Sequence, residues 1–325
     1  MTSLQDRGRI GHQRFGVSPA GAMDPLALAV ANALVGNPLD TAAIEMAVFG
    51  AALKAEGGSV RVALAGAEMA LEVGGEPVPP LASVTLREGE RLTIRSARSG
   101  VFAYLAVAGG FDVPPDLGSL SHHARSGLGP KRIESGTRLA VAGGEPSGPE
   151  RQLVGGLLPA STAPLAVILG PQDDYFSKAG IATFLSATYT ISTEADRMGY
   201  RLTGPKIEHE KGFNIVSDAI VTGSIQVPGS GEPIVLMTDR QTTGGYPKIA
   251  VVTRADLPRL AQMRPGSTVR FTAVSRTEAV ERLRAEARRL AEIVGRISAA
   301  GADLLASERL LGLNLAGDAA GVDHH

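Results

Sequence analysis

Apolar residues along the chain gather in short runs that are separated by turn-forming residues. In the first part of the chain, pairs such as Gly57-Gly58 and Gly74-Gly75 divide runs rich in Val, Ile and Leu. Runs of this kind are typical of β-strands. The predicted strands are Ile44–Phe49, Val60–Leu64, Met69–Val73, Val84–Leu86, Leu92–Ile94 and Phe102–Val107. Strands repeated at roughly 8–12-residue spacing favour a barrel or a sandwich.

A second strand-rich block follows residues 143–163, which are rich in Gly, Pro, Ser and Ala and which we interpret as a linker. Its predicted strands are Leu165–Leu169, Thr188–Ser192, Tyr200–Leu202, Ile215–Val216, Ile220–Val227, Ile234–Thr238, Ile249–Val252 and Thr268–Val274. The pattern therefore predicts a mainly β chain with a few helices. We divide it into a first domain (1–145), a second domain (164–275) and a helical C-terminal extension (276–325).

Helix signals are local and few. Asp24 can cap a helix over residues 24–35 that Gly36 ends, and Asp173 or Asp174 can cap a second helix that runs to about residue 186. A short helix is predicted near residues 255–263.

The segment 276–298 predicts an amphipathic helix. Helical spacing aligns an apolar stripe of Val280, Leu283, Ala287, Leu290 and Val294. We expect this stripe to pack on the body of the protein, and the alternative is a helix that binds a partner.

Composition narrows the class of protein. The 325 residues include 32 Lys and Arg against 33 Asp and Glu, and this balanced charge argues against a nucleic-acid binder. The absence of Cys excludes disulfides, iron–sulfur clusters and a Cys nucleophile. No apolar run reaches the roughly 18 residues of a membrane span, and Met1–Arg9 lacks the apolar stretch of a secretory signal. We therefore expect a cytoplasmic protein without a membrane segment.

Familiar catalytic motifs are missing from the sequence. It contains no Gly-Lys dipeptide, hence no Walker A loop, and no G-x-S-x-G or H-E-x-x-H motif. The neighbouring His122 and His123 cannot both face the same way on a strand, and we predict no metal site. Candidate chemistry therefore lies in polar clusters within loops.

The densest polar cluster runs from Asp239 to Lys248, between two apolar runs. Such side chains can orient a small polar or anionic substrate, and glycines let a backbone approach a ligand closely. The cluster combines the charged Asp239, Arg240 and Lys248 with Gln241, Thr242, Thr243, Gly244 and Tyr246. The alternative is a long hairpin loop whose side chains satisfy its own backbone.

Other polar clusters precede this one. The stretch Asp196-Arg197-Met198-Gly199-Tyr200-Arg201 fits either a binding wall or a surface turn with an Asp–Arg pair. The stretches Gly170–Asp174 and Asp6–Arg9 also hold aspartates close to cations or amides. For Asp24, Asp173 and Asp174, helix capping is the simpler interpretation.

Together these stretches resemble the biotin-dependent carboxyltransferase-like family, also called the allophanate hydrolase subunit 2 or Kip-type inhibitor-antagonist family. The resemblance extends over nearly the whole chain, to about residue 275. The matching stretches are Gln5–Arg9, Gly21–Asp24, Ala31–Asn37, Tyr104–Gly110, Gly170–Asp174, Asp196–Leu202, Ile225–Pro228 and Asp239–Ile249.

This resemblance implies two cyclophilin-like β-barrel domains. It is strongest to the stand-alone C components of ATP-dependent 5-oxoprolinase, a complex that opens 5-oxo-L-proline to L-glutamate. Their partners are a Kip-inhibitor-like protein, the B component, and a LamB/YcsF-type protein, the A component. The complex uses ATP.

The same resemblance implies roles for the polar clusters. Asp239 acts as a base or orients the amide N–H, and Arg240 and Lys248 stabilise charge on the lactam oxygen. The substrate-positioning residues are then Gln226, Gln241, Thr242, Thr243, Gly244, Tyr246, Asp196, Arg197 and Tyr200.

Two other functions stay open for this family. One is a carboxyltransferase component that acts on urea or a related small amide with carboxybiotin supplied in trans. The other is a regulatory antagonist of a Kip-type kinase inhibitor. The sequence has no biotin-attachment Ala-Met-Lys-Met motif and no region of ATP-grasp length. Family members usually carry an apolar strand before Gln5-Asp6, so we expect an incomplete first barrel or a misassigned start.

Overall fold

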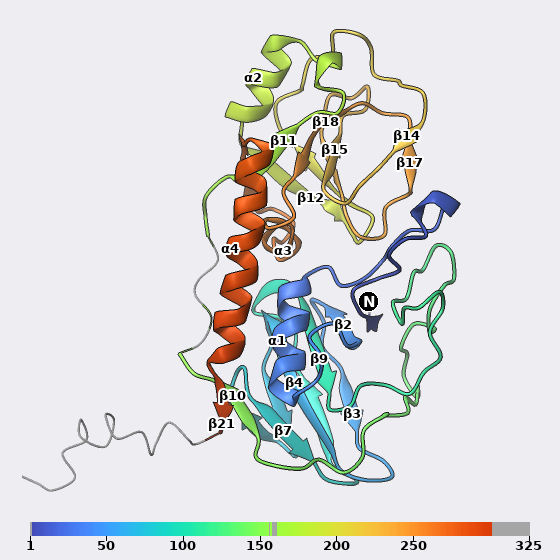
Figure 1. Ribbon diagram of the computed structural model, residues 1–325, viewed down its shortest axis with the longest axis vertical. Helices are drawn as coiled ribbons and strands as arrows, with labels where there is room; N and C mark the ends of the chain where they lie inside the picture. The colour runs from blue at the N-terminus through green and yellow to red at the C-terminus, as the bar shows by residue number, and fades with distance from the viewer. Residues whose placement is uncertain (1, 156, 158–160, 301–325) are drawn as a thin grey trace, which may run out of the picture.

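The computed structural model of the chain describes residues 2–155, 157 and 161–300. Two strand-rich halves lie one above the other, and helix α4 runs along the side of both (Figure 1). We call residues 2–142 the N-terminal half and residues 165–273 the C-terminal half. The described residues form 21 strands and four α-helices, which confirms the expectation of a mainly β chain with a few helices.

Two antiparallel sheets build the N-terminal half. The five-stranded sheet has the order β1-β2-β9-β4-β7, and the four-stranded sheet has the order β3-β8-β5-β6. Their strands are β1 (Thr2–Gln5), β2 (Ala43–Ala47), β3 (Ala52–Lys54), β4 (Val60–Glu68), β5 (Leu71–Val73), β6 (Glu76–Val78), β7 (Ser83–Leu86), β8 (Arg91–Ile94) and β9 (Ser99–Val107). One hydrophobic cluster joins both sheets, for example Leu64 of β4 and Leu92 of β8. The two sheets therefore pack face to face.

The central strand β9 is buried on both of its faces. Ala103 and Leu105 belong to the core between the sheets, whereas Phe102 and Tyr104 belong to the core that includes α1. This alternation follows the two-residue period of a strand. The helix α1 therefore covers the outer face of the five-stranded sheet.

The bounds of α1 (Pro25–Val35) agree with the local sequence signals. Asp24 Oδ1 accepts a hydrogen bond from the Ala27 backbone N–H at 3.0 Å, which caps the first turn. Gly36 ends the helix with a φ of 81°, a conformation that costs glycine little. The predicted helix over residues 24–35 is thus confirmed.

The C-terminal half is a nearly closed barrel of eight strands in the order β19-β12-β13-β16-β15-β18-β11-β20. The two edge strands, β19 and β20, are separated only by Arg270, and this short link brings the sheet edges together. The strands are β11 (Leu165–Leu169), β12 (Tyr189–Ala195), β13 (Gly199–Thr203), β15 (Ser224–Gln226), β16 (Ile234–Leu236), β18 (Lys248–Val252), β19 (Thr268–Val269) and β20 (Phe271–Ala273). A separate two-stranded pair joins β14 (Asp218–Ala219) to β17 (Thr243–Gly244). Helices α2 (Lys178–Ser186) and α3 (Leu257–Ala261) complete this half.

Some local predictions are wrong in detail. Ser177, not Asp173 or Asp174, caps α2, because the two aspartates lie in a separate 3₁₀ turn before it. The segment Ile215–Val216 is not a strand, and Val216 is 92% exposed with no sheet to cover it. The stretch interpreted as a linker contains β10 (Arg151–Leu153), which pairs with β21 (Ile297–Ala299).

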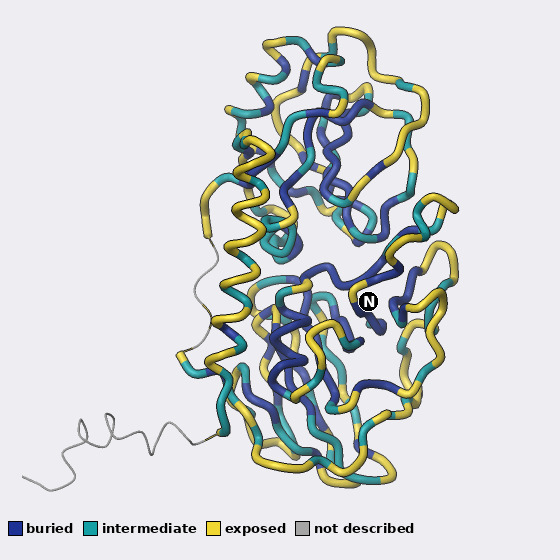
Figure 2. The backbone as a smooth tube through the Cα atoms, in the orientation of Figure 1, coloured by how far each residue is buried: buried dark blue, intermediate teal, exposed yellow. Residues whose placement is uncertain are grey.

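Helix α4 (Arg276–Gly295) begins with a capping box formed by Ser275 and Glu278. Its apolar stripe packs only near the C-terminal end, where Ile293 is buried, while Val280 is 43% and Leu283 is 42% exposed. The upper part of α4 is mostly exposed because the helix bridges the two halves (Figure 2). Packing of the whole stripe is therefore wrong for its first turns. Residues 301–325 of the predicted extension lie outside the described residues.

Helices that could cross a lipid bilayer were sought in the part of the chain that the structure describes. None there is both long enough and apolar enough for a span.

Candidate functional site

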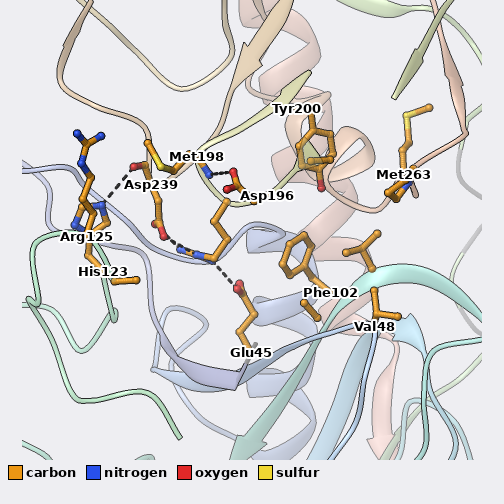
Figure 3. Close-up of a pocket in the computed structure, with 16 residues that line it drawn as sticks. Glu45, Val48, Phe102, His123, Arg125, Asp196, Met198, Tyr200, Asp239 and Met263 are labelled. Atoms are coloured by element: carbon orange, nitrogen blue, oxygen red, sulfur yellow. Dashed lines mark hydrogen bonds and ion pairs between the residues drawn. The ribbon is translucent and has the colours of Figure 1, made fainter. Parts of the chain in front are cut away.

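A pocket of about 370 Å³ lies between the two halves, within the size range of small-molecule sites. Figure 3 shows Arg125 and His123 beside Asp239 at one end, and Phe102, Val48 and Met263 at the other. One end is thus polar and the opposite end apolar. The lining residues are Glu45, Ala47, Val48, Val101, Phe102, His123, Ala124, Arg125, Ala195, Asp196, Arg197, Met198, Tyr200, Asp239, Met263 and Pro265.

Arg197 organises the polar end of the pocket. Its Nε and Nη2 donate to the two carboxylate oxygens of Asp239 at 2.9 and 2.8 Å, a bidentate pair. Its Nη1 lies 2.5 Å from Glu45 Oε1, and its Nη2 also donates to the Gly21 backbone oxygen at 2.7 Å. Asp239 belongs to the C-terminal half, whereas Glu45 and Gly21 belong to the N-terminal half. One guanidinium group therefore joins the halves at the pocket.

The charges in this network are buried. Burial lowers the pKa of Arg197, but the carboxylates of Glu45 and Asp239 outweigh burial and hold that pKa above its usual value. Tyr104 donates its hydroxyl to Glu45 Oε2 at 2.7 Å, and burial raises the pKa of Tyr104 well above its usual value. Arg197 is therefore charged, and Tyr104 is a neutral hydrogen-bond donor.

Gln262 joins the halves at the apolar end of the pocket. Its Oε1 accepts hydrogen bonds from the backbone N–H groups of Val101 at 2.8 Å and Phe102 at 3.0 Å. Its Nε2 donates to the Phe102 backbone oxygen and to Asp24 Oδ2, both at 2.8 Å. The amide thus fixes the position of its neighbour Met263, which lines the pocket.

Asp6 anchors a segment, residues 116–129, that reaches the pocket. Its carboxylate accepts from Ser119 Oγ and Ser121 Oγ at 2.6 Å and from the Leu120 N–H at 2.7 Å. Asp6 therefore acts as a structural anchor for this segment.

His123 contacts the pocket from the same segment. Its Nε2 lies 3.3 Å from the Asp239 backbone oxygen, and its Nδ1 lies 2.6 Å from Ser126 Oγ. Because a carbonyl oxygen only accepts hydrogen bonds, His123 carries its proton on Nε2.

A second polar group surrounds Lys248, which is 1% exposed. Its Nζ donates to Asp218 Oδ2 at 2.8 Å, and the Gln172 amide donates to the same oxygen at 3.0 Å. Hydrogen bonds from Lys248 and Gln172 lower the pKa of Asp218. Gln226 lies opposite Lys248 on β15 and contacts the turn that contains Gly244, with Nε2 3.4 Å from the Tyr246 backbone oxygen.

Arg240 is also buried, with 2% of its surface exposed. Its Nη2 donates to Gln13 Oε1 at 3.0 Å and to the Ile220 backbone oxygen at 3.2 Å. Its Nε and Nη1 have no hydrogen-bond partner within the described residues. Burial lowers the pKa of Arg240 to about 10.

The residues singled out from the sequence thus fall into two places. Asp196, Arg197, Tyr200 and Asp239 line the pocket, and the Tyr200 hydroxyl is occupied by the Ala261 backbone oxygen at 2.9 Å. The remaining residues lie outside its lining: Arg240, Lys248, Gln226, Gln241, Thr242, Thr243, Gly244 and Tyr246.

Sequence reasoning missed Glu45, His123, Arg125, Gln262 and Asp218. Glu45 left one usable signal, a single charge inside the apolar strand Ala43–Ala47. Within residues 2–155, 157 and 161–300, no group of three or more His, Asp or Glu side chains could hold a metal ion.

Comparison with protein families places the chain in a known group. Residues 15–273 match the model of the carboxyltransferase domain, subdomain A and B. The chain belongs to this carboxyltransferase domain family.

Relatives with curated names include two similar proteins, both the C component of 5-oxoprolinase. The chain is 38% identical to that component from Haemophilus influenzae, over 86% of its own length and 90% of that protein. It is 35% identical to the one from Escherichia coli over the same shares. It is also 31% identical to urea amidolyase of Saccharomyces cerevisiae, over 84% of this chain but only 16% of that longer protein.

Solved structures give a matching result. The crystal structure of Kluyveromyces lactis urea amidolyase superposes with a TM-score of 0.79 at 27% identity. The match covers 90% of this chain and 19% of that chain. The fold described above is thus similar to one part of that larger enzyme.

Proposed function

We propose that this chain is the C component of a cytoplasmic, ATP-dependent 5-oxoprolinase, which opens 5-oxo-L-proline to L-glutamate. The observation that carries the proposal is identity of 38% and 35% to two proteins of that name over nearly their whole length. The partners are a Kip-inhibitor-like B component and a LamB/YcsF-type A component. In the overall reaction, water cleaves the lactam C–N bond while ATP is hydrolysed to ADP and phosphate.

The pocket between the halves supports a role in binding the amide. Arg197 Nη1 carries two N–H groups and has one partner, Glu45 Oε1, within the described residues. The second N–H is placed to bind an amide oxygen and to stabilise the charge that develops there. Asp196 Oδ1 accepts from the backbone of Met198 and Gly199, which leaves Oδ2 to accept an amide N–H.

Asp239 then has a different role from the base expected from sequence. Both of its carboxylate oxygens are held by Arg197, so we propose that it keeps Arg197 charged and oriented. Arg240 and Lys248 act outside the pocket, on the loop that carries Asp239 and on the barrel wall.

ATP fits poorly in this pocket. Its lining holds the carboxylates of Glu45, Asp196 and Asp239 against the guanidinium groups of Arg197 and Arg125, a charge balance that disfavours a triphosphate. We therefore propose that ATP binds on another protein of the complex.

The test is ATP hydrolysis that depends on 5-oxo-L-proline, measured with this chain mixed with its cognate A and B components. Each of the three proteins is omitted in turn, and glutamate is quantified. We expect glutamate to form only when all three are present. Lack of turnover, with the chain folded and bound to the Kip-inhibitor-like partner, would overturn the proposal and favour the regulatory function.

The similarity to urea amidolyase supports a second candidate, a carboxyltransferase component acting on urea or a related small amide. Carboxybiotin would have to be supplied by another chain. A streptavidin blot of material that co-purifies with this chain separates the candidates, because only the carboxyltransferase requires a biotinylated carrier.

A further inference from the structure

One cation at the polar end of the pocket is available to a ligand. Arg125 lines the pocket and is exposed, and it makes no hydrogen bond or ion pair with the other residues drawn in Figure 3. Arg197, the other cation of the lining, is already held by Glu45 and Asp239. A negatively charged ligand group therefore has Arg125 as its natural partner.

The backbone around Arg125 is held firmly. The Gly127 N–H donates to the His123 oxygen at 3.0 Å, and the His123 N–H donates to the Leu128 oxygen at 2.9 Å. At the end of this turn, the Gly129 N–H donates to Asp116 Oδ2 at 2.7 Å. The position of Arg125 at the pocket is thus built into the segment and does not depend on a mobile loop.

Charge makes this residue decisive for an anion. With Arg125, the lining has three carboxylates, Glu45, Asp196 and Asp239, against two guanidinium groups. Without Arg125 only Arg197 would remain, and an anionic ligand would meet an excess of negative charge that disfavours its entry. A neutral amide such as urea would be affected far less.

We infer that the pocket selects small amides that carry a carboxylate, and that Arg125 is the specificity-determining residue that pairs with this carboxylate. The inference rests on the proposed function and deepens it, because 5-oxo-L-proline carries a carboxylate and urea does not. The amide oxygen then meets Arg197, and the apolar part of the ligand meets Phe102 and Met263.

The experiment compares two lactams that differ in one group. 5-Oxo-L-proline carries a carboxylate, and 2-pyrrolidinone is the same ring without it. The full chain is assayed with its A and B partners as wild type, Arg125→Ala and Arg125→Lys. Arg138→Ala serves as matched control, because Arg138 is an exposed arginine (87%) outside the pocket lining.

We expect Arg125→Ala to raise KM for 5-oxo-L-proline about tenfold, the effect of losing one charge-assisted pair. We expect kcat to change little, Arg125→Lys to recover part of the loss, and Arg138→Ala to behave as wild type. An unchanged KM in Arg125→Ala, in a complex that turns over 5-oxo-L-proline, would overturn the inference and leave the proposed function standing.

Binding to the chain alone keeps the two questions separate. Ligand-observed NMR with the same two lactams needs no turnover and no partner. Preference for 5-oxo-L-proline over 2-pyrrolidinone, lost in Arg125→Ala, supports the inference even if the complex proves inactive. Equal binding of the two lactams, or binding of neither, contradicts it.

Discussion

Arg197 and Glu45, 152 residues apart in the chain, form a buried ion pair with Nη1 2.5 Å from Oε1. Glu45 lies on β2 of the N-terminal half, and Arg197 lies between β12 and β13 of the C-terminal half. The side chains of both residues are at most 7% exposed. The pair therefore positions the two walls of the pocket relative to one another.

Replacing Glu45 by Gln should destabilise the protein strongly. The change leaves the buried Arg197 with one carboxylate instead of two, and removal of one member of a buried pair costs about 3 kcal/mol. The free energy of unfolding in urea measures the effect. Glu194→Gln is the control, because its ion pair with Arg201 is exposed to solvent. Equal stabilities of the two variants would show that the buried pair contributes little.

Gln262→Ala should loosen the contact between the halves locally. The variant leaves the Val101 and Phe102 N–H groups without their acceptor, at a cost of about 2 kcal/mol. Amide hydrogen exchange at these two positions should accelerate, while exchange at Ala63 in the neighbouring strand β4 should change little. Unchanged protection at both positions would mean that other contacts hold the halves together.

Lys248→Met should make the protein more sensitive to acid. Because Lys248 and Gln172 lower the pKa of Asp218 in the folded state, their stabilising effect is complete above the unfolded pKa of about 4. It is lost as pH falls through the lower folded pKa. Unfolding followed between roughly pH 2 and 5 should therefore begin at higher pH in the variant. Lys211→Met, which removes only an exposed pair with Asp174, should unfold like wild type.

Two substitutions on α4 should differ in cost although both remove an apolar side chain. Ile293 is 3% exposed, so Ile293→Ala should lower the free energy of unfolding by about 3 kcal/mol. Leu283 is 42% exposed, so Leu283→Ala should change it only slightly. Thermal denaturation of both variants gives the comparison. A large loss in Leu283→Ala would mean that a further surface covers this turn in solution.

Sequence patterns predicted the elements whose signals are local. Asp24 and Gly36 mark the ends of α1, and the apolar run Leu165–Leu169 coincides with β11. The cap of α2 was misplaced because Asp173 and Asp174 resemble capping residues as closely as Ser177 does. Adjacent sequence alone does not separate a 3₁₀ turn from the first turn of a helix.

The candidate site was less predictable because its contacts are long-range. Arg197 and Asp239 were singled out, but their bidentate pairing and the link to Glu45 depend on how the halves pack. Gln262 carried no signal at all, since an amide after a short helix is ordinary on a protein surface. Its role follows only from the edge of β9 that lies against it.

The strand pair β10–β21 closes the chain into a mechanical loop. The chain leaves the N-terminal half after β10, builds the whole barrel, and returns along α4 to pair its last described strand with β10. A cut between β10 and β11 would therefore not release two free pieces, because α4 would still tie the barrel to the N-terminal half. Pulling the halves apart requires breaking this seam together with the ion pair of Arg197.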